Sequence, residues 1–236
     1  MTELFDDLEE RYRKYVASKL GKDRNPCSFL YVNKACKAAQ TITEDYDLGI
    51  EIATDGLALG YIFSLHGFPT KAVRLSRRGR GAIWQPIDDI SKEDINGKRL
   101  LLFDNDVVTG RTLRRTTREL GKSSPACMDL LLMHETTLLT VEGYKKWRKS
   151  YNIPAIKDSF DFDPLEIRET PKGIEIDYVR DGERWQRTMK LDNRFMLALS
   201  TRRNVPKEIR KTMTLQKDFE DDEEALINLE RILRSG

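Results

Sequence analysis

The sequence predicts an α/β protein, in which a parallel, twisted sheet flanked by helices is followed by a smaller α+β element. Up to about residue 140, apolar strand-like runs alternate with helix-like segments, the pattern of a parallel sheet with helices on its faces. Beyond residue 150, apolar and polar positions alternate instead, as they do in hairpins. A chain of 236 residues is long enough for a core domain that carries a smaller appendage.

The chain begins with a helical pattern. Leu4, Leu8, Tyr12 and Val16 recur at spacings of four residues between charged side chains, which predicts an amphipathic helix. A second, shorter helix is predicted over residues 34–42. We assign residues 1–45 to an N-terminal helical segment.

The next three segments predict one strand-helix-strand unit. Residues 46–53 have the pattern of a strand that enters a turn, residues 57–69 of a helix that ends near Gly67 and Pro69, and residues 71–76 of a second strand. Such a unit is typical of parallel sheets.

The following segment, residues 76–89, is irregular. It holds three arginines, two glycines and a proline, and it fits neither a period of 2 nor one of 3.6, so we expect a mobile loop. Residues 96–106 then predict a strand that is apolar on both faces, as at the centre of a parallel sheet. A helix over 110–120 and a buried strand over 126–137 complete an α/β core, which we assign to residues 46–145.

The remaining residues, 146–236, have a different character. Residues 174–191 alternate apolar and polar positions around Asp181-Gly182, a pair that favours a hairpin. Residues 219–236 predict an amphipathic helix with acids near its N-terminal end, where the helix dipole favours them. We therefore expect a separate small α+β appendage rather than a continuation of the parallel sheet.

Composition excludes several classes of protein. The net charge of +2 comes from 41 basic and 39 acidic residues, so the overall balance does not point to nucleic acid or membrane. The N-terminus lacks a basic region followed by an apolar one, and no apolar stretch approaches the roughly 20 residues that span a bilayer. The three cysteines have no metal-binding spacing. We expect a cytoplasmic protein without a zinc site.

The strand at residues 100–103 ends in Asp104, Asn105 and Asp106 and continues through VVTGRT into a helix. Backbone N–H groups at a helix N-terminus bind anions. Gly110 allows a close approach of the backbone to a ligand, and the hydroxyls and positive charge around it suit a phosphate. The acids upstream suit sugar hydroxyls or a magnesium ion. The alternative is a turn that only caps the helix.

These residues resemble the phosphoribosyl-pyrophosphate (PRPP) signature of the type I phosphoribosyltransferases, namely four apolar residues, two acids, two or three variable residues and then T-G-x-T. The resemblance implies a type I phosphoribosyltransferase-like fold. It also implies that Asp104 and Asn105 occupy the catalytic pair that meets the ribose hydroxyls, with Asp104 next to the metal through these hydroxyls or water. The loop implied around the 5′-phosphate consists of Val108, Thr109, Gly110, Arg111 and Thr112.

Two further segments lie in the order that the family has. LGIEIATDG resembles the family's first strand and pyrophosphate loop, often held in a strained peptide geometry, and SRRGRG stands where the family has a flexible lid. The pyrophosphate-binding residues implied by this resemblance are Thr54, Asp55, Gly56, Arg77, Arg78 and Arg80. The resemblance covers roughly residues 46–140. Asn105 and Asp55 depart from the family pattern, since Asn105 replaces an acid and Asp55 replaces glycine or a basic residue.

The function implied by the resemblance is transfer of the phosphoribosyl group of PRPP to a nitrogenous base, with release of pyrophosphate, Mg²⁺ as cofactor and a homodimer as the assembly. The base would be held by a hood outside the core, formed by the N-terminal segment, by residues 150–236 or by both. The alternative, raised by Asn105 and Asp55, is a non-catalytic PRPP- or nucleotide-binding regulator. Its basic stretches at 111–118, 145–149 and 202–211 would then contact nucleic acid. A third interpretation is an interaction protein with a vestigial pocket.

Overall fold

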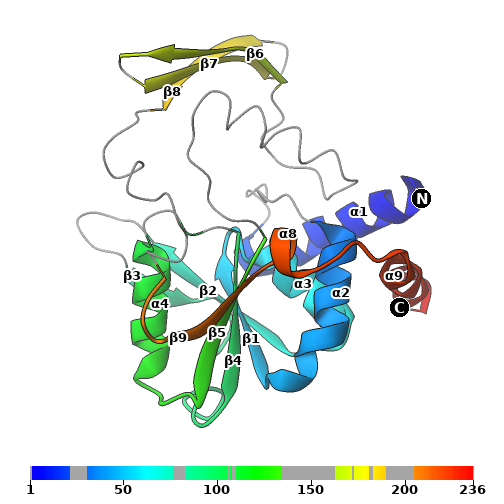
Figure 1. The fold of residues 1–236 in the computed structure, drawn as a ribbon, viewed down its shortest axis with the longest axis vertical. Helices are drawn as coiled ribbons and strands as arrows, with labels where there is room; N and C mark the ends of the chain where they lie inside the picture. Colours follow the sequence, from blue (N-terminus) through cyan, green and yellow to red (C-terminus); the bar gives the residue numbers. More distant parts are fainter. Residues whose placement is uncertain are drawn as a thin grey trace.

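The computed structural model describes residues 2–21, 31–76, 83–105, 107, 110–133, 163–171, 173–180, 183–189 and 205–235. Its centre is a six-stranded sheet with the order β3-β2-β1-β4-β5-β9 (Figure 1). The strands are β1 (Leu48–Ala53), β2 (Thr70–Ser76), β3 (Ile83–Pro86), β4 (Arg99–Asp104), β5 (Cys127–Leu132) and β9 (Ile209–Thr214). All neighbours pair in parallel except β2 and β3, which are antiparallel. The predicted α/β fold with a parallel sheet is confirmed.

Both faces of this sheet are covered. One face packs on α1 (Thr2–Leu20), α2 (Val32–Ile42), α3 (Leu57–Leu65), the short α8 (Leu215–Asp218) and α9 (Glu223–Ser235), and the short helix η1 (Thr43–Asp45) follows α2. The other face packs on α4 (Arg111–Gly121), through Leu113 and Leu120. Figure 1 shows α4 on the opposite side of the sheet from α2 and α3. This double cover explains why β4 reads as a continuous apolar run, because Leu100 to Phe103 are all buried.

The N-terminal helices pack on the core. The predicted amphipathic helix is α1, whose Leu8, Tyr12 and Val16 are fully buried in the same cluster as Phe63 of α3. The second predicted helix is α2, which contacts α3 and α9. Among the described residues, no helix is both long and apolar enough to cross a membrane.

The structure corrects the prediction for the end of the chain. Residues 209–214, expected in a separate appendage, form β9 and pair in parallel with β5. They do not read as a sheet strand because β9 is at the edge, and its buried Ile209 is followed by two exposed residues, Arg210 and Lys211. The helix predicted at residues 219–236 is α9, which packs on α2. The last residues therefore complete the main body.

A second correction concerns the irregular segment after β2. Residues 83–86 form β3, which pairs antiparallel with β2 from Val73 to Ser76. No strand-like period is visible there because this edge strand has only four residues, one of them a proline. Residues 77–82, the rest of the predicted loop, lie outside the described residues.

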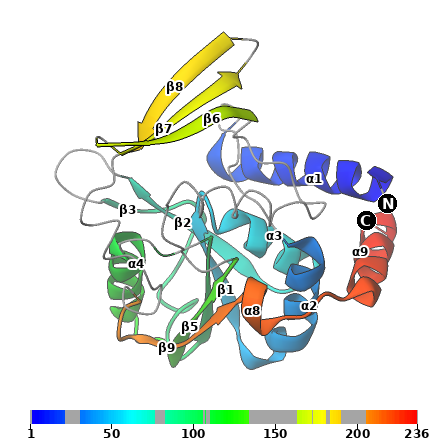
Figure 2. The same ribbon diagram turned by 45° about the horizontal axis from the view of Figure 1, so that its top comes forward.

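The predicted hairpin is confirmed. It consists of β7 (Gly173–Arg180) and β8 (Glu183–Met189), and β6 (Asp163–Thr170) adds a third antiparallel strand. Buried Asp177 accepts hydrogen bonds from Arg184 and Gln186, each at 3.1 Å. Figure 2 shows this small sheet apart from the main one. The division of the chain at residues 45 and 145 stays a prediction.

Candidate functional site

The two predicted loops follow neighbouring strands of the sheet. Strands β1 and β4 are parallel and in register, with Glu51 beside Phe103. The segment 54–56 begins directly after β1, and Asp104 is the last residue of β4. Since the carboxyl ends of parallel strands lie at one edge of a sheet, the topology brings both segments to the same place.

Gly56 makes the contact between these two segments. A Cβ atom on Gly56 would lie 2.1 Å from the carbonyl oxygen of Phe103 and 2.8 Å from the backbone nitrogen of Ile52. Its N–H donates a hydrogen bond to the Ile52 carbonyl at 2.9 Å. Only glycine allows this approach, so residues 54–56 pack directly on the backbone that leads into Asp104. The Ala53–Thr54 peptide bond is cis.

Asp104 and Asn105 form the end of β4. The Asn105 N–H donates a hydrogen bond to Asp104 Oδ1 at 2.9 Å. The Met133 N–H donates to the carbonyls of both residues, at 3.3 and 3.1 Å, and this ties the ends of β4 and β5 together. The Asn105 side-chain oxygen is buried, and among the described residues it has no hydrogen-bond partner.

The loop after Asn105 leads into α4. Val107 is buried in the core between the sheet and α4. Gly110 has a left-handed backbone (φ 66°, ψ 8°), a conformation that glycine adopts most readily. Gly110 is also the N-cap of α4, and no side chain caps the helix there. The first turn of α4, which includes Arg111 and Thr112, therefore meets the requirements of a helix N-terminus that binds an anion.

Several predicted site residues lie outside the described part of the chain: Val108, Thr109, Arg77, Arg78 and Arg80, together with Asp106. The described ones, Thr54, Asp55, Gly56, Asp104, Asn105, Gly110, Arg111 and Thr112, all lie at the carboxyl ends of β1 and β4 or at the start of α4.

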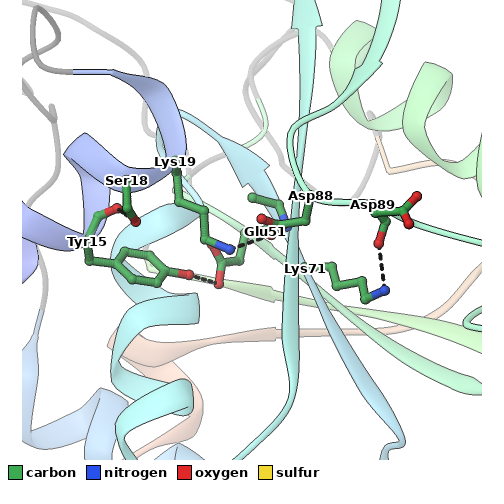
Figure 3. Close-up of polar contacts among 8 residues, drawn as sticks. Tyr15, Ser18, Lys19, Glu51, Lys71, Asp88 and Asp89 are labelled. Carbon is green, nitrogen blue, oxygen red and sulfur yellow. Dashed lines mark hydrogen bonds and ion pairs between the residues drawn. The ribbon is translucent and has the colours of Figure 1, made fainter.

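Sequence reasoning missed one polar cluster. Glu51, on β1, is fully buried, and its Oε1 accepts a hydrogen bond from the Tyr15 hydroxyl of α1 at 2.5 Å (Figure 3). Four residues further along α1, Lys19 pairs with Asp88. The sequence offers one signal of this cluster, a single acid within the apolar run LGIEIA. Because an ionisable residue is seldom fully buried, the run alone does not predict that this acid is buried.

Asp104 is the acid that the sequence predicts next to a metal ion. Within those ranges, no group of three or more His, Cys, Asp or Glu side chains could hold a metal ion. Mg²⁺ usually takes one or two carboxylates and completes its shell with water and substrate phosphates. The Asp104 carboxylate, at the edge of the sheet, fits that role.

The sequence is similar to a known phosphoribosyltransferase over about half of its length. No family model matches the sequence. Over 126 residues, 53% of this chain, the sequence is 33% identical to an orotate phosphoribosyltransferase of Sulfurisphaera tokodaii, and the match spans 59% of that relative.

Two solved structures are also similar. A purine phosphoribosyltransferase of Pyrococcus horikoshii gives a TM-score of 0.39 at 23% identity, over 46% of this chain and 76% of that one. A hypoxanthine phosphoribosyltransferase of Staphylococcus aureus gives a TM-score of 0.36 at 17% identity, over 44% of this chain and 63% of that one.

Proposed function

We propose that this protein is a type I phosphoribosyltransferase that binds PRPP and transfers its phosphoribosyl group to a nitrogenous base. The observation that carries the proposal is the contact of Gly56 with the Phe103 carbonyl. It joins the segment that resembles a pyrophosphate loop to the strand that ends in the PRPP motif. The match to an orotate phosphoribosyltransferase supports the same assignment.

Each part of PRPP has a partner in this proposal. The ribose hydroxyls lie at Asp104 and Asn105. The 5′-phosphate lies in the loop of residues 108–112, where the N-terminus of α4 and Arg111 favour negative charge. The pyrophosphate lies over residues 54–56. Arg77, Arg78 and Arg80 follow β2 directly in the sequence, and we assign them to the pyrophosphate as well.

The reaction follows from this placement. The lone pair of a ring nitrogen forms the new bond to C1 of the ribose while the bond from C1 to the pyrophosphate oxygen breaks. The carboxylate of Asp104 stabilises the positive charge that develops on the ribosyl group. The three arginines neutralise the departing pyrophosphate and exclude water, which would otherwise hydrolyse PRPP. Mg²⁺, when bound with PRPP, supplies further positive charge at the pyrophosphate.

A pyrophosphate-release assay tests turnover. Purified protein is incubated with PRPP, Mg²⁺ and one base at a time, with orotate first because of the relative's activity. Purine bases and uracil complete the panel. Release that requires both PRPP and one of the bases supports the proposal. If the protein binds PRPP but releases no pyrophosphate with any of these bases, the transferase proposal is wrong and the second candidate, a regulator, is favoured.

The second candidate is a regulator that binds PRPP or a nucleotide without turnover. Asn105 favours it, because an amide cannot supply the negative charge of the second acid. Arg111, Arg114 and Arg118 are exposed along one side of α4, and such a stripe could contact nucleic acid. If the protein is such a regulator, it should bind RNA or DNA with an affinity that falls steeply as the salt concentration rises, because phosphate contacts release counterions.

We also propose that the protein forms a homodimer, which analytical ultracentrifugation would detect.

A further inference from the structure

The sheet contains two fully buried acids with different surroundings, Asp129 on β5 and Glu51 on β1. Asp129 accepts hydrogen bonds from the Tyr46 hydroxyl at 2.6 Å, from two Arg210 nitrogens at 3.1 and 2.6 Å, and from the Lys211 N–H at 3.0 Å. Its charge is therefore compensated by a bidentate guanidinium. Asp129 has the partners that a structural buried acid requires.

Glu51 lacks such compensation. Its Oε1 accepts the Tyr15 hydrogen bond, while its Oε2 is buried and has no hydrogen-bond partner within the described ranges. The nearest cation, Lys19, is already paired with Asp88, whose Oδ2 also accepts the Ala72 N–H at 2.7 Å. A buried carboxylate that has hydroxyl donors but no cation of its own is costly, and such groups occur most often where they serve a function.

The residues that surround the Glu51 side chain come from four parts of the chain. Tyr15 and Lys19 come from α1, and Asp88 comes from the segment after β3 (Figure 3). Thr70, on β2, also acts on Glu51. From α3, the ring of Tyr61 lies 5.0 Å from the ring of Tyr15. The backbone of α3 also presses on Glu51, since a Cβ at Gly60 would lie 2.2 Å from the Glu51 side chain.

We propose that Glu51 is a positioning residue: together with Tyr15 it ties α1 to the strand that leads into residues 54–56, and the tie depends on the ionised carboxylate. Glu51 stands three residues before Thr54, so α1 is fixed to β1 close to the predicted pyrophosphate loop. The link to the loop rests on the proposed function, whereas the tie itself does not.

The carboxyl group of Glu51 gains or loses its proton near neutral pH. Burial raises the pKa of Glu51 from its ordinary 4.5 to about 7, against the opposing effects of Thr70, Tyr15 and Lys19. Because the folded protein holds this proton more tightly than the unfolded chain, the stability gained from it is present below pH 4.5 and is lost as the pH rises to about 7. Above pH 7, the charged carboxylate relies on the hydroxyls of Tyr15 and Thr70, because Lys19 is shared with Asp88.

The test compares four proteins without ligand: wild type, Tyr15→Phe, Glu51→Gln and Tyr46→Phe. Their melting temperatures are measured at pH 5.5 and pH 8. The melting temperature of Tyr15→Phe should fall below wild type at both values, and by about 3 °C more at pH 8, because a hydrogen bond to a charged group is stronger than one to a neutral group. Glu51→Gln should gain on wild type as the pH rises, since the amide carries no charge to bury.

Tyr46→Phe is the matched control. It also removes a hydroxyl from a buried carboxylate, but Arg210 keeps Asp129 compensated at both pH values, so its effect should not depend on pH. If Tyr15→Phe lowers the melting temperature equally at the two pH values, the proposed contact does not depend on the ionised carboxylate, and the proposal is wrong. It is also wrong if a pH-dependent loss for Tyr15→Phe persists when Glu51 is also Gln.

The positioning role is tested by calorimetry with PRPP and Mg²⁺ at pH 8. Tyr15→Phe should weaken PRPP binding by about tenfold, because small displacements of a binding loop are costly. Tyr46→Phe should leave it unchanged. Equal affinity for Tyr15→Phe and wild type would overturn the positioning role. If wild type itself binds no PRPP, the proposed function fails, and the melting temperatures still decide whether the tie exists.

Discussion

Asn105 is the residue at which the two candidate functions diverge. It stands beside Asp104 at the end of β4, and its side-chain oxygen is buried without a hydrogen-bond partner among the described residues. In a transferase, a carboxylate at this position would face a ribosyl group that becomes positively charged. An amide of the same shape offers only its dipole.

We predict that Asn105→Asp raises kcat/KM for pyrophosphate release by about tenfold, or ~1.4 kcal/mol of transition-state stabilisation. The same change of charge at exposed Asn96, in the turn before β4, is the control and should leave kcat/KM unaltered. A drop in kcat/KM for Asn105→Asp, or a rise no larger than that of Asn96→Asp, would show that charge at residue 105 does not assist the reaction.

Gly56 allows a second prediction at the residue scale. Alanine there would place Cβ 2.1 Å from the Phe103 carbonyl oxygen, which belongs to the backbone and can move only with β4. We expect Gly56→Ala to lower the free energy of unfolding by roughly 1–3 kcal/mol, as other overpacking changes do. Thermal melting measures this loss.

Gly121→Ala is the control for that experiment. Its Cβ would meet no atom within 4 Å at the end of α4, so alanine should be neutral or slightly stabilising. A Gly56→Ala variant as stable as wild type would mean that residues 54–56 do not rest on β4, and the proposed site would lose its central contact.

At the scale of elements, the N-terminus of α4 is the proposed binding site of the 5′-phosphate. We predict that Gly110→Val abolishes PRPP binding, because a β-branched side chain is strained at a φ of 66° and would fill the space that an anion needs at the helix N-terminus. Thr109→Val, which removes a hydroxyl from the same loop, should also abolish binding with little loss of folding.

Gly97→Val is the control for Gly110→Val, because it introduces the same backbone strain away from the proposed ligand site. Gly97 has a φ of 69° and open space around its Cβ position, in the turn before β4. Gly110→Val and Gly97→Val should melt below wild type by similar amounts, but Gly97→Val should keep its PRPP affinity in calorimetry whereas Gly110→Val should lose it. Undiminished affinity in Gly110→Val would remove residues 108–112 from the phosphate site.

The elements that the sequence predicted well are those whose buried positions follow a regular pattern. Strand β4 is buried on both faces and reads as an apolar run, and α1 is amphipathic with a regular spacing. Strands β3 and β9 were missed because each lies at an edge of the sheet, where polar and apolar positions mix. The pairing of β9 also depends on β5, a contact distant in the sequence that no local pattern encodes.

The candidate site was predictable for a related reason. Asp104, Gly110 and Thr112 interrupt an apolar strand and a helix with polar groups and glycine, so they stand out in the sequence. Glu51 did not stand out, because a single acid in LGIEIA is equally consistent with an exposed position. Only the packing of α1 and α3 over β1 shows that it is buried.

At the scale of the whole molecule, the chain closes on itself around one sheet. Helices α1 and α2 from its beginning and β9 and α9 from its end pack on the same body, and Arg11 of α1 donates a hydrogen bond to the Leu233 carbonyl of α9 at 2.7 Å. The segment between β5 and β9 contains the three-stranded sheet. That sheet is thus inserted between two neighbouring strands of the main sheet, and it and the N-terminal helices are our candidates for holding the base.

The central claim is that the carboxyl ends of β1 and β4, with the start of α4, bind PRPP. Isothermal titration calorimetry of the wild-type protein with PRPP in the presence of Mg²⁺ tests it most directly. We predict one site per chain with a dissociation constant between about 1 μM and 1 mM, the range in which enzymes bind their substrates. Absence of binding heat at millimolar PRPP, together with an unchanged melting temperature, would contradict the claim.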